Sequence, residues 1–330
     1  MFNNWFGVAG DLGPSQLIDF FVANTSCKKI LFNPSEIESV EFWTHYLKNN
    51  NAMGLICGTS QSIIGFKWES TLRKAANTLG LTVICMEDFP GNYNEIGTAK
   101  TDILIIEDEF SLRLYHYKLK EIPKSILCPS LRYDVLRCDV IEKPIFNSER
   151  LKVLWIGQPE FEFNIKSLLH IIAEIKNLSI TLLFRAHPSD VEYKNGLYIK
   201  FFEDNNLTWQ DVTLEKIDSN LFNNVSLLIT QFSSVSILAG FYGVPSLHLL
   251  FKDVGEKLLL ERTGSADLMQ VFYNAAFYMK DHRKMNYLHS CIFDSAQREI
   301  ILSNFAKLYK INQKQMPNLI YQIEKMLHFI

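Results

Sequence analysis

The chain has 330 residues, about twice the size of an ordinary domain, which excludes one small module and favours two domains that each bury a core. With 48% hydrophobic and 21% charged residues, the composition lies far from that of disordered chains. The net charge of −3 lacks the basic excess of proteins that bind a phosphate backbone, so we expect no nucleic-acid partner.

Cysteine usage and the lack of long apolar runs indicate a cytoplasmic protein. The six cysteines show no CxxC pair and no metal-ligand spacing, so we expect buried thiols in a reducing compartment. The N-terminal residues lack a signal-peptide pattern, and no run of about 18 apolar residues occurs. Aromatic residues make up 13% of the chain, which leaves peripheral contact with the inner face of a membrane open.

Short apolar runs alternate with longer amphipathic stretches, as in parallel strands joined by crossover helices, so the predicted class is α/β. In the first half, strands are expected at Trp5–Val8, Lys29–Phe32, Gly54–Cys57, Thr82–Met86, Ile103–Ile106 and Ser125–Cys128. Helices are expected between them at Ser15–Val22, Glu36–Leu47, Lys67–Leu79 and Glu109–Leu119.

The polar stretch Leu136–Arg150 interrupts this alternation and is the predicted linker, giving an N-terminal acceptor domain over 1–140 and a C-terminal nucleotide-donor domain over 150–330. Strands of the second domain are expected at Lys152–Ile156, Ile180–Phe184, Leu227–Thr230 and Ser246–Leu249, and helices at Glu162–Lys176, Ser233–Phe241 and Gln297–Tyr309. Two Rossmann-like halves facing a central cleft are therefore predicted.

The last stretch, Pro317–Ile330, carries an apolar stripe at helical spacing that needs a partner surface. We expect this helix to cross back to the first domain, and packing wholly on the second domain is the alternative.

One motif places a guanidinium and an imidazole at the end of a predicted strand. It reads Arg185-Ala186-His187-Pro188. An imidazole there can donate a hydrogen bond to a phosphoryl oxygen or protonate a leaving group, and a guanidinium matches phosphate geometry. The alternative is that both side chains only brace the turn.

A second pattern begins where another strand leads into Ser233-Ser234 before a helix. Hydroxyls and free N–H groups at a helix start suit a phosphate, although paired serines are also ordinary N-caps. Gly157-Gln158, after the first strand of the second half, permits close backbone approach to a ligand. The sequence has no GxxxxGK[ST], GxGxxG, HExxH or GxSxG motif.

Candidate bases lie in the first half. Glu87-Asp88 ends a predicted strand, and a carboxylate in a half-dry cleft has a raised pKa and can act as a general base. Asp88 as a turn cap is the alternative reading. Asp11, in the loop after the first strand, is a second candidate base. Thr59-Ser60 is expected to bind an acceptor sugar or to cap the helix that follows.

These features resemble GT-B glycosyltransferases of bacterial surface polysaccharide synthesis. The resemblance rests on the two Rossmann-like halves, on the His187 motif, and on Ser233-Ser234 with Gly243-Val244-Pro245. The chain looks most like enzymes with cytidine-activated donors: sialyl- and Kdo-transferases of capsule and lipooligosaccharide, and CDP-glycerol glycerophosphotransferases. Cys128–Asp134 is similar to the Gly-x-Pro-Arg-Tyr-Asp stretch that closes the first domain in many of them.

The resemblance implies an inverting transferase that needs neither metal nor cofactor. It would move a nonulosonic-type sugar (sialic acid, Kdo or a relative) from a CMP-activated donor to a glycan or lipid-linked glycan. The resemblance assigns the base to Asp88 beside Glu87, and stabilisation of the leaving phosphate to His187. The implied donor-binding residues are Gly157, Gln158, Arg185, Pro188, Ser233 and Ser234.

This sequence differs from its UDP- and GDP-sugar relatives at the position that binds the nucleotide ribose. UDP- and GDP-sugar relatives usually carry a glutamate in the helix after the serine pair, and here that stretch is Ser236-Ile237-Leu238-Ala239-Gly240. Ribose recognition stays unassigned and a UDP donor is disfavoured. The alternatives from other classes are a CDP-glycerol-type polyol-phosphate transferase and a non-catalytic binding protein of the same fold.

Overall fold

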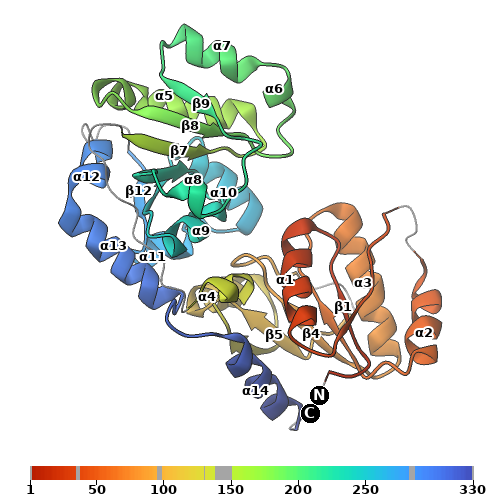
Figure 1. The fold of residues 1–330 in the computed structure, drawn as a ribbon. Helices are drawn as coiled ribbons and strands as arrows, with labels where there is room; N and C mark the ends of the chain where they lie inside the picture. Colours follow the sequence, from red (N-terminus) through yellow and green to blue (C-terminus); the bar gives the residue numbers. More distant parts are fainter. Residues whose placement is uncertain are drawn as a thin grey trace. The chain divides into compact units, whose positions relative to one another are not determined.

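The computed structural model describes residues 2–34, 38–94, 99–129, 131–137, 151–281 and 287–328. The chain divides into two compact units (Figure 1): unit 1 consists of Met1–Arg137 and Gln313–Ile330, and unit 2 of Cys138–Asn312. Most of the predicted linker, residues 138–150, lies outside the described residues.

The described residues of unit 1 contain a parallel sheet with strand order β2-β1-β3-β4-β5-β6. The strands are β1 (Trp5–Val8), β2 (Lys28–Lys29), β3 (Gly54–Cys57), β4 (Thr82–Met86), β5 (Ile103–Ile106) and β6 (Lys124–Leu127). Helices cover both faces, which is why the strands are apolar without alternation. Ile56 of β3 joins one core, and its neighbours Leu55 and Cys57 join the other.

One face of this sheet packs against α1 (Leu12–Ala23), α14 (Met316–Leu327) and the 3-10 helix η1 (Leu131–Leu136). The other face packs against α2 (Val40–Asn49), α3 (Ile63–Thr78) and α4 (Glu109–Lys118). Ser62 caps α3 by accepting from the N–H of Gly65, and so the helix begins four residues before the predicted Lys67.

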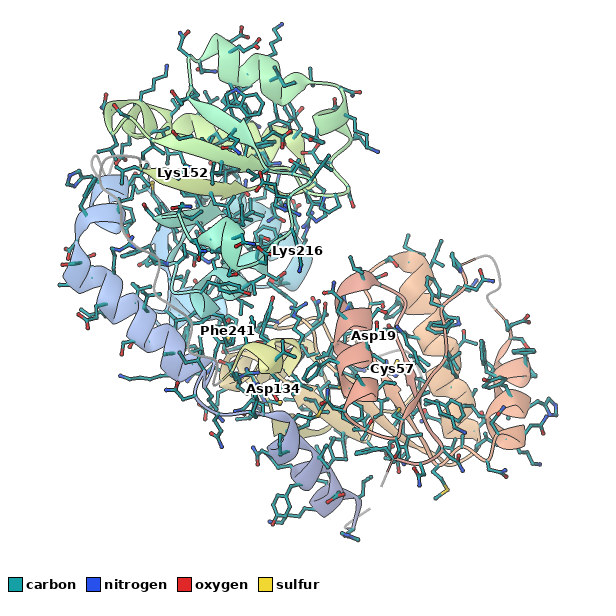
Figure 2. All side chains as sticks on the ribbon, in the orientation of Figure 1. Asp19, Cys57, Asp134, Lys152, Lys216 and Phe241 are labelled. Atoms are coloured by element: carbon teal, nitrogen blue, oxygen red, sulfur yellow. The ribbon has the colours of Figure 1, made fainter. Side chains whose placement is uncertain are left out.

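The C-terminal helix α14 belongs to unit 1. Its Leu319 and Ile323 are buried in the same core as Ile126 of β6. The carboxylate of Asp134 in η1, labelled in Figure 2, accepts the N–H groups of Gln315 (2.7 Å) and Met316 (3.0 Å) at the start of this helix. Apolar packing and backbone hydrogen bonds therefore both hold the returning segment on unit 1.

The described part of unit 2 contains a parallel sheet with strand order β12-β11-β10-β7-β8-β9. Read from β9, this is the 3-2-1-4-5-6 order of dinucleotide-binding sheets. The strands are β7 (Lys152–Ile156), β8 (Thr181–Arg185), β9 (Trp209–Asp211), β10 (Leu227–Thr230), β11 (Ser246–Leu249) and β12 (Phe277–Met279).

Helices of unit 2 lie on both faces of its sheet. One core includes α5 (Phe161–Asn177), α7 (Leu197–Asp204), α12 (Tyr287–Phe293) and α13 (Ser295–Leu308). The other includes α8 (Ser219–Phe222) and α9 (Val235–Phe241). The remaining helices are α6 (Val191–Lys194), α10 (Gly255–Thr263) and α11 (Met269–Phe272).

The predicted α/β class is confirmed, and the central strands match their predicted ranges. The edges do not. Of Lys29–Phe32 only Lys29 is in a strand, and β9 and β12, three residues each, carry too short an apolar pattern to be recognised. Helix α2 begins at Val40, while residues 36–37 of the predicted helix lie outside the described part.

The five cysteines of the described residues are buried, as predicted, and Cys138 lies outside that part of the chain. Within the described residues, no helix has the length and apolarity needed to cross a bilayer.

Candidate active site

Each sheet has one topological switch point, where neighbouring strands continue in opposite directions across the sheet. In unit 1 it lies between β1 and β3, and in unit 2 between β7 and β10. Ligands of open parallel sheets bind outside the carboxyl ends of such strands. The relevant loops are 9–11 and 58–61 in unit 1, and 157–160 and 231–234 in unit 2, and they contain most of the predicted site residues.

A buried polar network fixes the loops after β7 and β8 in unit 2. The side chain of Asn164 in α5 accepts from the N–H of Gln158 (2.9 Å) and donates to its carbonyl (2.7 Å) and to the hydroxyl of Tyr198 (2.7 Å). Tyr198 donates in turn to Asp190 (2.5 Å), after the His187 motif. A Cβ at Gly157 would stand 3.1 Å from this amide, so glycine keeps the loop close to α5.

The loop after β10 joins the same network. Nε2 of Gln231 donates to Ser167 (3.0 Å) and to Asn164 (3.3 Å). Burial lowers the pKa of His248 to about 4, so this imidazole is neutral, and its Nδ1 lies 2.9 Å from the carbonyl oxygen of Gln231. Three loops at one edge of the sheet are thus held by side chains that are themselves locked, as preorganised sites require.

His187 is half-buried after β8, with a defined tautomer. The N–H of Ser189 donates to its Nδ1 (3.1 Å), so Nε2 carries the proton of the neutral ring. Burial, and then the positive charge of Arg262, hold the pKa of His187 below its ordinary value. At neutral pH the side chain therefore presents an Nε2–H donor rather than a cation.

Arg262 of α10 was not singled out from the sequence. Its Nη1 donates to the side-chain oxygen of Gln158 (3.2 Å), and its Nη2 pairs with the carboxylate of Glu160. Its guanidinium carbon lies 5.4 Å from the ring centroid of Phe232, after β10. One guanidinium thus contacts both the loop that contains Gln158 and the loop that contains Phe232.

The other predicted donor-binding residues have different surroundings. Nη1 of Arg185 donates to the carbonyls of Val212 (2.8 Å) and Glu215 (2.6 Å), and so this guanidinium braces the loop after β9. Ser233 accepts from the N–H of Val235 (3.3 Å) at the start of α9, and Ser234 lies beside it. Pro188 is exposed.

In unit 1, the amides at the switch point are already occupied by the chain's own carboxylates. Asp11 accepts the N–H groups of Gln61 (2.7 Å) and Ser62 (2.9 Å). Glu69 of α3 accepts the N–H groups of Gly10 (3.0 Å) and Ser60 (3.0 Å) as well as the Ser60 hydroxyl. Glu69, also missed from the sequence, is buried, and burial raises its pKa to about 7. These contacts leave the unit 1 loops poorly suited to a phosphate.

Asp88 lies at the carboxyl end of β4 in a mostly desolvated position. Its Oδ1 accepts from the hydroxyl of Thr59 (3.0 Å) and the amide of Asn92 (3.0 Å). Its Oδ2 lies beside Gly13, where a Cβ would stand 2.5 Å from that oxygen. Burial raises the pKa of Asp88, against the opposing charge of Arg132. A carboxylate held in this way is a stronger base than a solvated one.

Glu87 points instead into the protein. Its carboxylate accepts from the N–H of Gly91 (3.0 Å), the N–H of Glu107 (3.2 Å) and the hydroxyl of Tyr115, and burial raises its pKa to about 8. Thr59 and Ser60 are buried too, and each hydroxyl serves a carboxylate. The surroundings of these three residues favour structural roles over acceptor binding.

The raised pKa of Glu87 predicts a pH-dependent stability. Because its pKa is about 8 when folded and near 4.5 in the unfolded chain, the folded protein binds more protons between these values. The free energy of unfolding of unit 1 should therefore fall as pH rises from about 4.5 to 8. Glu87→Gln should flatten this slope in urea titrations at pH 5, 6.5 and 8, whereas exposed Glu121→Gln should not. An unchanged slope in Glu87→Gln would contradict the assignment.

The sequence matches no protein-family model and no curated protein. Among solved structures, MurG from Acinetobacter baumannii is 12% identical (TM-score 0.61; 98% of this chain and 99% of that one covered). A glycosyltransferase from Rickettsia africae is 11% identical (TM-score 0.65; 98% of each chain). The wall teichoic acid polymerase TagF, solved after a soak with CDPG, is 14% identical (TM-score 0.52; 98% and 89%).

Further similarity extends to Anabaena Alr3699/HepE, solved in complex with UDP and glucose, at 11% identity (TM-score 0.65; 99% of each chain). Likeness at this level of identity concerns the fold. The structural neighbours are glycosyltransferases and related enzymes of GT-B type, and the predicted GT-B fold is confirmed.

Proposed function

We propose that the protein is a glycosyltransferase that binds a nucleotide-activated donor at the switch point of unit 2. The observation that supports this proposal is that the loops after β7 and β10 meet at Arg262, whose guanidinium contacts Gln158 and Phe232, and that the charge of Arg262 lowers the pKa of His187 in the loop after β8. The corresponding loops of unit 1 are less suited to bind a phosphate, because their backbone N–H groups already donate to Asp11 and Glu69. The GT-B neighbours support transfer as the reaction class.

For the donor, we propose a CMP-activated nonulosonic sugar, supported by the resemblance of the His187 and Ser233-Ser234 motifs to cytidine-dependent transferases. Polyol-phosphate transfer from CDP-glycerol is the second candidate, supported by the likeness to TagF with CDPG. Because HepE was solved in complex with UDP and glucose, UDP is the nucleotide against which CMP and CDP are compared. The proposed acceptor is a glycan, free or lipid-linked, at the cytoplasmic side of the inner membrane.

In this scheme, Asp88 takes the proton from the acceptor hydroxyl as the new glycosidic bond forms, while the bond between the sugar and the donor phosphate breaks. The nucleotide leaves with the electron pair of that bond. Hydrogen bonds from the Nε2–H of His187 and from Ser233 and Ser234 stabilise the charge that develops on its phosphate. Gln158 and Gly157 form the wall of the same subsite.

Thermal unfolding with CMP, CDP, UMP, UDP and GDP tests the donor assignment. A ligand that binds only the native state raises the melting temperature, so CMP or CDP should produce the largest rise. Equal stabilisation by UDP and CMP would overturn the cytidine assignment. Incubation with CMP-sialic acid, CMP-Kdo and CDP-glycerol, with detection of CMP and of the product mass, then distinguishes sugar transfer from polyol-phosphate transfer.

A further inference from the structure

The surroundings of Arg262 differ from those of an ordinary surface arginine. The guanidinium carbon lies 5.4 Å from the centroid of the Phe232 ring, and one of its nitrogens donates to buried Gln158. Gln158 and Phe232 follow β7 and β10, the two strands that flank the switch point of unit 2. A cation held by contacts to both of these loops thus lies at the edge of the sheet where ligands of this architecture bind.

The carboxylate that pairs with this cation is incompletely hydrogen-bonded, because Oε2 of Glu160 is buried and has no hydrogen-bond partner among the described residues. Glu160 accepts from Nη2 of Arg262, and the two side chains are 34% and 38% exposed. Ion pairs with this much exposure contribute little to stability, so a stronger anion can replace the carboxylate. The phosphate monoester of free CMP carries more charge than a carboxylate, and both it and the singly charged phosphodiester of a CMP-sugar can accept two parallel N–H bonds from one guanidinium.

Arg185, the arginine predicted from the sequence to bind the donor, has different partners from Arg262. Nη1 of Arg185 donates to two backbone carbonyls of the loop after β9. Arg262, in contrast, pairs with the partly exposed carboxylate of Glu160, and its positive charge lowers the pKa of His187.

We infer that Arg262 binds the phosphate of the donor nucleotide, and that Glu160 holds the guanidinium in its binding orientation until the phosphate displaces the carboxylate. This inference rests on the proposed function. Because Glu160 competes with the ligand, the two charges have opposite effects on affinity: removing the cation weakens nucleotide binding, and neutralising the carboxylate strengthens it.

Isothermal titration of the full chain with CMP, CDP, UDP and the nucleosides cytidine and uridine tests the inference. Arg262→Gln should weaken nucleotide binding about tenfold or more, the usual effect of losing a charged hydrogen bond, and leave nucleoside binding unchanged. Glu160→Gln should tighten nucleotide binding by up to about fivefold. Lys280→Gln is the matched control, because Lys280 pairs with Glu256 of the same helix α10.

Nucleotide binding that is unchanged in Arg262→Gln, or weakened equally in Lys280→Gln, would overturn this inference alone. Equal weakening of nucleotides and nucleosides in both Arg262→Gln and Glu160→Gln would do the same, because it would show that the pair only supports the loop. Wild-type protein that binds none of these nucleotides would overturn the proposed function and this inference together.

Discussion

Asp88→Asn should lower the transfer rate by about 10² to 10⁴, the range typical of losing a general base, while nucleotide affinity stays near wild type. The amide is nearly isosteric and can still accept from Thr59 and Asn92, but it cannot take a proton from the acceptor. Single-turnover rates and nucleotide titration of the same preparation separate the two effects. The melting temperature of the variant reports whether unit 1 remains folded.

Asp11→Asn is the comparison that locates the base. The Asp11 carboxylate accepts from two backbone N–H groups and from the Ser62 hydroxyl, so this substitution should reduce stability more than turnover. If Asp88→Asn keeps near-normal turnover while Asp11→Asn loses it, the base lies on the other loop. If neither affects turnover, the catalytic assignment of unit 1 is wrong.

His187→Ala should lower the transfer rate by about 10² to 10³, because it removes one preorganised donor to the charge that develops on the leaving phosphate. Nucleotide affinity should fall less than the rate. The control is His289→Ala, since His289 is an exposed imidazole of α12 in the same unit. A variant of His187 that retains wild-type turnover would exclude this residue from the reaction.

The pH profile tests how His187 acts. Since its pKa is held below the ordinary value and Ser189 donates to its Nδ1, the neutral ring supplies the Nε2–H donor. We therefore expect transfer activity of the wild-type enzyme to stay level as pH rises from about 6.5 to 8. A steep loss over this interval would show that the imidazolium form is required.

The sequence predicts the positions of loops better than the partners of side chains. Strands β1, β3, β4, β5, β7, β10 and β11 lie at or near their predicted ranges because each is a buried apolar run, and the site loops follow directly from their ends. His187 and Ser233 were found because they stand next to such ends. The edge strands β9 and β12 lack that pattern and were missed.

The missed site residues have a common physical origin. Arg262 and Glu69 lie within helices, where a charged residue normally faces solvent, and only tertiary packing brings them to loops more than eight residues away in the chain. Arg185 stands at the predicted strand end, but its guanidinium turns toward carbonyls after β9. Side-chain direction at a strand end depends on neighbouring strands, which local sequence does not encode.

Hydrogen exchange of the full chain, free and saturated with the nucleotide that stabilises it most, tests whether unit 2 binds the donor. If unit 2 binds the donor, exchange should slow in peptides covering 157–160, 187–190 and 231–235 of unit 2, with little change in 9–13 and 58–62 of unit 1. Protection confined to the unit 1 loops, with no change after β7, β8 and β10, would contradict donor binding by unit 2.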